Sequence, residues 1–401
     1  MEYKINQELL SQLDAEIDAM MSEVVENRRY LHMHPEIGFD TVGTEKMVKK
    51  ILSDNQIEIL DTKLGVLGVI PGKNRKRMIA LRADMDALCL QEENSVSYKS
   101  LYENKMHACG HDGHTAMLLG AAKLLQRHRE ELETDVLLIF QPAEEGPTPG
   151  GAKLILEEMK KLGLLEKTER IFGQHLFNNY PCGMVGYKFG AKASSTDEFY
   201  IKVIGKGGHA GLPHQTIDAL SIGAKIVTAM ESFMSRRIDP FDSAVFSVGI
   251  FESGSAINIV ADSAKISGTI RCQKDETRAY ILKNMEQIVN GLCQAYGATC
   301  KIDIIHGLPV QVNDAETTEY AKKVLEQAIG KERIFEIPQP MMGAEDFAYY
   351  AQVIPASFVD IGSANAERNL AVLGHNPKFD FDEEAMKTGI KVLCSLAFSM
   401  K

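Results

Sequence analysis

Three short apolar runs in this 401-residue chain are each followed by side chains that can bind a metal or move a proton. The runs and their followers are residues 78–81 with Asp84 and Asp86, residues 134–141 with Glu144 and Glu145, and residues 170–174 with His175. Continuous apolar runs of this length are typical of strands buried on both faces of a parallel sheet. Because open α/β sheets bind ligands at the carboxyl ends of their strands, the pattern predicts an α/β fold with a polar site at one sheet edge.

The densest metal-binding chemistry lies in residues 106–114, which hold three histidines, a cysteine and an aspartate. The apolar residues that follow repeat at helical spacing, and Asp112 or Thr115 can cap that helix. Cys109 and His111 are therefore expected on the turn that leads into the helix. A thiolate and an imidazole two residues apart suit a borderline-soft cation such as Zn²⁺, Co²⁺, Ni²⁺ or Mn²⁺.

The remaining ligands are expected at the ends of the other strands. In the adjacent pair Glu144 and Glu145, one carboxylate can bind metal while its neighbour stays free as a general base. Residues 372–375 place a further histidine, His375, before a helix expected to begin near Asp380.

Four polar side chains near these segments are given supporting roles. His107 and His114 are expected to fix the loop by hydrogen bonds rather than to bind metal. Asp86 is a candidate for holding a ligating histidine in one tautomer, and Asp84 for a structural carboxylate.

Residues from about 197 to 305 have a different organisation. They read as strand 197–204, helix 216–234, strand 244–251, strand 264–271, helix 277–296 and strand 299–305. This β-α-β-β-α-β order is the ferredoxin-like pattern, a two-layer sandwich that leaves a sheet face or edge free for association. The sequence therefore predicts a discontinuous metal-binding catalytic domain of residues 1–190 and 308–401. An inserted satellite domain of residues 191–307 would serve dimerisation or act as a lid.

A series of short motifs runs along nearly the whole chain. The motifs are Arg28-Arg29-Tyr30-Leu31-His32 with Pro35-Glu36, Leu81-Arg82-Ala83-Asp84-Met85-Asp86-Ala87-Leu88, the block from His107 to His114, Gln141-Pro142-Ala143-Glu144-Glu145-Gly146, Gly207-Gly208-His209-Ala210, Gly268-Thr269-Ile270-Arg271, Gly343-Ala344-Glu345-Asp346-Phe347 and His375-Asn376-Pro377. This ordered series resembles the dinuclear metallo-amidohydrolases of the aminoacylase/carboxypeptidase family of zinc peptidases. The resemblance is greatest to its subgroup of N-acyl-amino-acid, hippurate and indole-acetyl-amino-acid hydrolases.

The resemblance implies a site for two divalent transition-metal ions per subunit, with manganese, zinc, cobalt and nickel as candidates. The implied ligands are Cys109, His111, Glu145, His175 and His375. The Cys109 sulfur is a candidate for bridging both ions, and Glu144 is the implied general base.

The resemblance also gives roles to three satellite-domain residues. His209 and Asn258 would grip the substrate, often across a dimer, and Arg271 would bind a substrate carboxylate. A guanidinium fork is a natural receptor for a carboxylate. The implied function is metal-dependent hydrolysis of N-acyl amino acids that carry acetyl, benzoyl or similar acyl groups. A dipeptidase or carboxypeptidase using the same dinuclear site is the alternative.

Two rival classes remain open at this stage. A cysteine-nucleophile enzyme would use Cys109 with His111 or His114, but a side chain two positions away in a tight turn is poorly placed to take the thiol proton. A non-catalytic metal-binding protein would have no need of Glu144, which has no ligand role in this interpretation.

The bulk properties favour a cytoplasmic enzyme. A formal charge of -11 without a basic block argues against nucleic acid as a partner, because phosphate binding needs a basic surface. The amino-terminal residues lack the pattern of a signal peptide, and no stretch approaches the roughly 20 apolar residues of a membrane span. We expect a small-molecule substrate, no membrane association and a homodimer formed through the satellite domain. The seven cysteines fit reduced thiols.

Overall fold

In the computed structural model, which describes residues 6–147 and 149–399, the chain divides into two compact units. The first unit contains the chain up to Gly190, Val312–Gln339, and the chain from Asp346 onward. The second contains Ala191–Gln311 together with Pro340–Glu345.

The second unit ends later than the expected boundary at residue 307 and gains a separate short segment. That segment is held by backbone hydrogen bonds: the Met341 N–H donates to the Lys192 carbonyl at 3.0 Å, and the Ser194 N–H donates to the Gly343 carbonyl at 2.9 Å. Contacts between segments so far apart in the chain leave no local sequence signal, so the periodic pattern did not reveal them.

The first unit is built on an eight-stranded mixed sheet with the strand order β1-β2-β4-β3-β5-β16-β6-β15. Its strands are β1 (Glu58–Ile59), β2 (Val66–Ile70), β3 (Asn74–Asp84), β4 (Thr134–Gln141), β5 (Thr168–Pro181), β6 (Val185–Tyr187), β15 (Ile334–Glu336) and β16 (Ala356–Ala364). The central strands β4, β3, β5 and β16 are all parallel to their neighbours within this block. Antiparallel pairs lie on both sides of it, between β2 and β4 and between β16 and β6.

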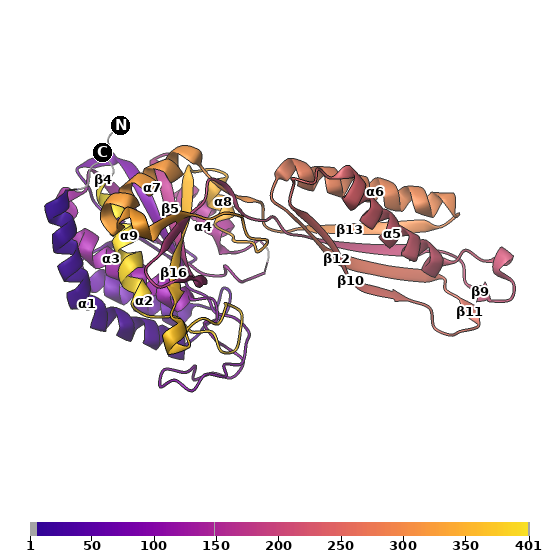
Figure 1. Cartoon of the computed structure of the whole chain (residues 1–401), viewed down its shortest axis with the longest axis horizontal. Coiled ribbons are helices and arrows are strands. Elements are labelled where there is room, and N and C mark those ends of the chain that lie inside the picture. The colour runs from indigo at the N-terminus through magenta and orange to yellow at the C-terminus, as the bar shows by residue number, and fades with distance from the viewer. Residues whose placement is uncertain (1–5, 148, 400–401) are drawn as a thin grey trace. The chain divides into compact units, whose positions relative to one another are not determined.

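Helices cover both faces of this sheet, as Figure 1 shows. One apolar core contains residues of α1 (Gln7–Met33), α2 (Val42–Asp54), α3 (His111–Arg127), α7 (Ala315–Ile329) and α9 (Ala385–Phe398), and the other contains residues of α4 (Gly151–Lys161) and α8 (Ala348–Ala351). Along β4, Leu138 belongs to the first core and Leu137 to the second, because successive side chains of a strand point to opposite faces. Within the described ranges no helix has the length and apolarity needed to cross a membrane.

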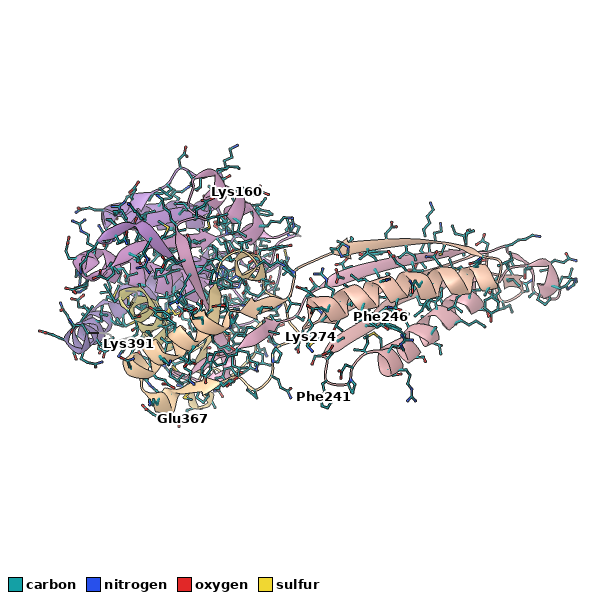
Figure 2. The ribbon with its side chains drawn as sticks, turned by 90° about the horizontal axis from the view of Figure 1, so that it is seen from above. Lys160, Phe241, Phe246, Lys274, Glu367 and Lys391 are labelled. Carbon is teal, nitrogen blue, oxygen red and sulfur yellow. The ribbon has the colours of Figure 1, made fainter. Side chains whose placement is uncertain are left out.

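The second unit is a two-layer sandwich of a four-stranded antiparallel sheet and two helices (Figures 1 and 2). Its elements are β8 (Asp197–Ile204), α5 (Ala219–Arg237), β10 (Ala244–Ser253), β12 (Ser263–Cys272), α6 (Asp275–Ala295) and β13 (Thr299–His306). The strand order is β10-β12-β8-β13, which is the order of the predicted ferredoxin-like pattern. Both helices pack on one face, and side chains on the other face, such as Tyr200 and Ile305, are exposed.

A small two-stranded ribbon extends the second unit. It pairs β9 (Gly208–His209) with β11 (Ile259–Val260) in antiparallel register. Two further short strands, β7 (Gly190–Ala193) and β14 (Gln311–Asn313), lie where the chain passes from one unit to the other.

Candidate metal centre

The cysteine and histidine block folds into a turn that ends in α3, which begins at His111. The residue before it, Gly110, has a φ of +86°, a left-handed conformation that glycine adopts without steric cost. The predicted caps are wrong, because the N-cap position carries no side-chain hydrogen bond. Asp112 instead accepts a hydrogen bond from Arg28 at 2.8 Å, and the Thr115 hydroxyl donates to the carbonyl of the last residue of β3 at 2.8 Å.

The paired glutamates follow β4, which ends at Gln141, as predicted. Ala143 has a φ of +57°, a conformation that costs a non-glycine residue on the order of 1–3 kcal/mol and that clusters at functional sites. The N–H groups of Glu144 and Glu145 donate to the two carboxylate oxygens of Asp86 at 2.9 and 3.0 Å. Asp86 therefore anchors the backbone that carries both glutamates.

His175 lies inside β5 and not at its end. Strand β5 continues to Pro181 because its pairing with β16 continues, with Asp360 opposite His175 and Gly362 opposite Phe177. The expectation of a strand end at His175 is therefore wrong, although the side chain still reaches the other candidate ligands.

His375 lies in a loop, and the helix after it, α9, begins at Ala385 rather than near Asp380. The Asp380 carboxylate accepts a hydrogen bond from Arg28 at 2.8 Å and one from the next backbone N–H, so it does not cap a helix there. His375 has a φ of +61°, and its N–H donates to the Ala108 carbonyl at 2.8 Å. This bond ties the His375 loop to the cysteine and histidine block.

The structure brings the five predicted ligands together in two groups that share one cysteine. The groups are Cys109 with His111 and His175, and Cys109 with Glu145 and His375; in each, the potential ligand atoms lie within 4.8 Å of one another. The Cys109 sulfur is 3.3 Å from His175 Nε2, and His375 Nε2 is 2.8 Å from a Glu145 oxygen. His111, Glu144 and Glu145 form a third such group, so proximity alone leaves either glutamate able to bind metal.

The two histidines of the first group, the buried His111 and the half-buried His175, each have one ring nitrogen fixed by a backbone carbonyl. His111 makes a 2.9 Å hydrogen bond through Nδ1 to the Asp86 carbonyl, while its buried Nε2 has no hydrogen-bond partner among the described residues. His175 makes a 2.8 Å bond through Nδ1 to the Leu176 carbonyl, which leaves Nε2 facing Cys109. Such second contacts set the tautomer and direction of metal-binding histidines. Sulfur, nitrogen and carboxylate donors together fit a transition-metal cation.

In the group of Cys109, Glu145 and His375, the cysteine and the histidine carry protons that a metal ion would displace. Hydrogen bonds with Cys109 and then Glu145 raise the pKa of His375 to about 10. Burial raises the pKa of the Cys109 thiol above its usual value. Burial also opposes ionisation of Glu145, but the hydrogen bond with His375 and the nearby charge on His111 leave the pKa of Glu145 lowered.

The supporting histidines differ from each other. His114 fixes the site as expected, because its Nδ1 lies 2.6 Å from Asp84 and its Nε2 accepts a 2.9 Å hydrogen bond from the Leu176 N–H. The prediction for His107 is wrong: both of its ring nitrogens are buried without a hydrogen-bond partner in the described part of the chain. Burial lowers the pKa of His107 to about 3, so its ring is neutral near pH 7.

Two further polar residues near the site were not singled out from the sequence. Arg82 is buried in β3, and Asp346 accepts a 2.8 Å hydrogen bond from it. The available signal was an arginine directly after the apolar run of β3, where a fully buried charge requires a partner.

The three predicted substrate-binding residues all lie in the second unit. Two of them are close together, and the third lies at a different position. His209 and Asn258 are close together on the β9–β11 ribbon, since the Ala210 N–H donates to the Asn258 carbonyl at 3.1 Å. Arg271 lies near the other end of β12, eight residue steps from Ser263, which is about 26 Å at a strand rise of about 3.3 Å per residue. Its guanidinium donates to the Met342 carbonyl at 3.2 Å.

Comparison with known proteins places the chain in a family. Residues 80–399 match peptidase family M20/M25/M40. The chain belongs to this family. Among curated relatives, the IAA-amino acid hydrolase ILR1-like 4 of Arabidopsis thaliana is 39% identical over 376 residues, which are 92% of this chain and 84% of the relative. The N-acetylcysteine deacetylase of Bacillus subtilis is 36% identical over 382 residues, which are 94% and 97% of the two chains.

A solved structure agrees with these sequence matches. The YXEP protein of Bacillus subtilis, described as a dinuclear metal binding peptidase from the M20 family, superposes with a TM-score of 0.81 at 33% identity, covering 95% of this chain and 98% of that one. The shared fold is a mixed α/β sheet flanked by helices. Together with the two ligand groups around Cys109, these findings support a hydrolase that acts on amides and a centre for two divalent metal ions.

Proposed function

We propose that this member of the family hydrolyses the amide bond of N-acyl amino acids, releasing a carboxylic acid and a free amino acid. The observation that carries the proposal is the pair of three-residue groups sharing Cys109, with Glu144 beside them. The relatives named for hydrolysis of IAA-amino acid conjugates and of N-acetylcysteine act on this substrate class.

We assign the ligands from the two groups. Cys109, His111 and His175 would hold one ion, and Cys109, Glu145 and His375 would hold the other, so that Cys109 is shared by both groups. Glu145 is favoured over Glu144 as a ligand because it already lies 2.8 Å from His375. The ions supply Lewis acidity, which lowers the pKa of a water molecule and polarises the amide carbonyl. Manganese, zinc, cobalt and nickel all suit these donors.

Glu144 then performs the proton transfers. Its backbone is held by Asp86, and its carboxylate accepts a long 3.4 Å hydrogen bond from the Asp346 N–H. In this role Glu144 takes a proton from the attacking water and delivers it to the leaving nitrogen, as a general base and then a general acid. These contacts to its backbone and to its carboxylate hold Glu144 in place for both transfers.

Residues of the second unit are assigned to the substrate. His209 supports the acyl carbonyl with Asn258, and Arg271 binds the carboxylate of the amino acid. Selection for a free carboxylate next to the scissile amide excludes internal peptide bonds. It leaves dipeptides and carboxy-terminal residues as the second candidate substrate class, which the description of YXEP as a peptidase favours.

The test is a substrate screen with the metal-loaded protein. N-acetyl, N-benzoyl and indole-acetyl amino acids are compared with the matching amides that lack the free carboxylate, and with a few dipeptides. Faster turnover of the acyl amino acids than of both other sets supports the proposal. Preference for dipeptides would replace it with the peptidase function.

We expect activity to fall on chelation and to return with a divalent transition metal. Cys109→Ser should weaken metal binding at both positions at once, because a shared thiolate is replaced by a harder and mostly protonated oxygen. Equilibrium dialysis with Mn²⁺ or Zn²⁺ measures the loss of metal affinity. Cys182→Ser is the matched control, because that thiol belongs to neither ligand group. Unchanged metal affinity in Cys109→Ser would contradict the shared-sulfur site.

Metal affinity should rise with pH. In the metal-free protein, His375 has a pKa of about 10 and Cys109 has a raised pKa, so both carry protons at pH 7. Each proton displaced makes affinity about tenfold higher per pH unit below these pKa values. Calorimetry of Zn²⁺ binding in buffers of different ionisation enthalpy counts the protons released, and a count of zero would contradict this account.

The rival with a cysteine nucleophile is disfavoured by the site. A reactive cysteine is activated by a lowered pKa, whereas burial raises the pKa of Cys109. The role of the paired glutamates would also be unexplained in that chemistry.

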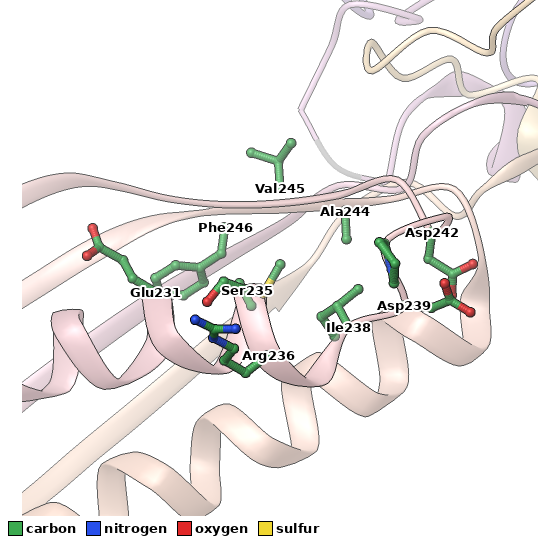
Figure 3. A pocket seen from close by; sticks show the side chains of 11 residues that line it. Glu231, Ser235, Arg236, Ile238, Asp239, Asp242, Ala244, Val245 and Phe246 are labelled. Atoms are coloured by element: carbon green, nitrogen blue, oxygen red, sulfur yellow. The ribbon is translucent and has the colours of Figure 1, made fainter.

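We propose that the second unit forms a homodimer through its edge strand β10. Val245, Ile250 and Phe251 on this strand are exposed, and Phe241 before it is 92% exposed and projects from the unit in Figure 2. A hollow of about 740 Å³ between the end of α5 and the start of β10 continues this surface, with Ile238, Ala244 and Phe246 among its lining residues (Figure 3). Exposed apolar side chains along an unpaired strand edge favour association. The cytoplasmic location stays a prediction.

A further inference from the structure

Arg82 joins two carboxylates deep inside the first unit. Its side chain is 1% exposed, and it lies on β3 between β4 and β5 in the middle of the sheet. The guanidinium donates to Asp84 at 2.6 Å and to Asp346 at 2.8 Å, and its Nε donates to Gln141 at 3.0 Å. The guanidinium holds its N–H donors in fixed directions within one plane, so this one side chain reaches all three acceptors in a set geometry.

One of these carboxylates leads to a candidate metal ligand. Asp84 lies 2.6 Å from His114 Nδ1, which assigns the proton to that nitrogen and leaves Nε2 as an acceptor. His114 Nε2 accepts a 2.9 Å hydrogen bond from the Leu176 N–H. The carbonyl of the same residue accepts from His175 at 2.8 Å. Leu176 is thus held by His114 on one side and in turn orients the His175 ring.

The other carboxylate leads to the candidate general base. Asp346 receives hydrogen bonds from Arg82, from Gln141 at 2.8 Å and from the Ala152 N–H at 2.9 Å. These bonds hold the Asp346 carboxylate, and the N–H of the same residue donates to the Glu144 carboxylate at 3.4 Å. Two chains of hydrogen bonds therefore start at Arg82. One arm runs through Asp84 and His114 to His175, and the other arm runs through Asp346 to Glu144.

A buried cluster of this kind is weak as a source of stability. Desolvation of the charges offsets most of their attraction, and apolar replacements of similar volume are often neutral or better. Hydrogen bonds that orient ligands and bases from behind have a different effect, since their loss typically lowers metal affinity or activity 10- to 100-fold. The arrangement around Arg82 matches the second case, because each arm ends at a different functional group.

We propose that Arg82 is a positioning residue that aligns the metal ligand His175 through Asp84 and the base Glu144 through Asp346. The inference rests on the proposed function for the roles of these two groups. It requires that the two arms be separable: one controls metal binding and the other controls turnover.

The experiment compares two variants that each interrupt one arm with one that interrupts both. His114→Leu should weaken Mn²⁺ binding by the metal-free protein at least about tenfold, with kcat at saturating Mn²⁺ within about threefold of the parent. Asp346→Asn should keep Mn²⁺ affinity within about threefold and lower kcat at least about tenfold at unchanged KM. Arg82→Lys, which keeps the charge but not the fork, should show both losses.

Arg278→Lys is the matched control for stability. Arg278 makes two 2.7 Å bonds to the buried Asp197 in the second unit, so this variant breaks a comparable pair away from the ligand groups. It should lower the melting temperature without changing Mn²⁺ affinity. If Arg82→Lys does not fold, His114→Leu and Asp346→Asn still test whether one arm controls metal binding and the other controls turnover.

Equal losses of affinity and kcat in both single-arm variants, or parental values in Arg82→Lys, would overturn the inference. If the parent binds Mn²⁺ and hydrolyses acyl amino acids, and all variants behave like the parent, only the positioning role is refuted. A parent that does neither refutes the proposed function itself. Melting temperatures and Mn²⁺ binding are measured without substrate, so the two failures are distinguishable.

Discussion

Glu144→Gln should keep both metal ions and lose at least about 10²-fold in kcat, the lower end of what general acid-base catalysis contributes. The glutamine side chain has nearly the same shape and can still accept the hydrogen bond from the Asp346 N–H. It cannot take a proton from water, so the chemistry fails while the fold and the ligands remain. Metal content by elemental analysis and kcat on an N-acetyl amino acid measure the two halves of the prediction.

Glu145→Gln is the matched partner of this variant. Its side chain lies 2.8 Å from His375 and 4.8 Å or less from the Cys109 sulfur, so we expect lower metal occupancy rather than a purely chemical defect. Full metal content in Glu145→Gln together with metal loss in Glu144→Gln would mean that the two roles are reversed. Near-parental kcat in Glu144→Gln would remove the general base from the proposal.

The sequence predicted the second unit most closely where local periodicity and packing agree. The predicted strands 197–204 and 299–305 correspond to β8 and β13, in which exposed residues alternate with buried residues in β8 and with partly buried residues in β13. The helix predicted from residue 216 begins instead at Ala219. The Asp218 carboxylate accepts the Ser221 N–H at 3.1 Å and so sets the start of that helix.

The candidate site was predictable in composition but not in detail. The five candidate ligands were named from their motifs, yet His175 lies within a strand that pairing with β16 extends, and His375 has a left-handed backbone conformation. Neither property is encoded in a short run of residues. The bond from Arg82 to Asp346 joins residues 264 positions apart, so only the folded sheet reveals it.

The separation of His209 from Arg271 bears on which subunit completes the site. Within one second unit, His209 is on the ribbon at one end and Arg271 is near the other end of β12, about 26 Å along the strand from Ser263. A single N-acyl amino acid is far shorter than this separation. We therefore expect the two residues that serve one substrate molecule to come from different subunits of the proposed homodimer.

Mixing His209→Ala with Glu144→Gln should then restore activity that neither variant has alone. If His209 acts in trans, a mixed dimer has one site with intact Glu144 and intact His209, and one site that lacks both. With random equal mixing, recovery should reach at most about a quarter of the parental rate per total site. The exposed His214 nearby gives the matched control, since His214→Ala should be active by itself. Two differently tagged variants that exchange subunits in a pull-down yet stay inactive would show that His209 serves its own subunit, and a monomeric parent would exclude the trans arrangement altogether.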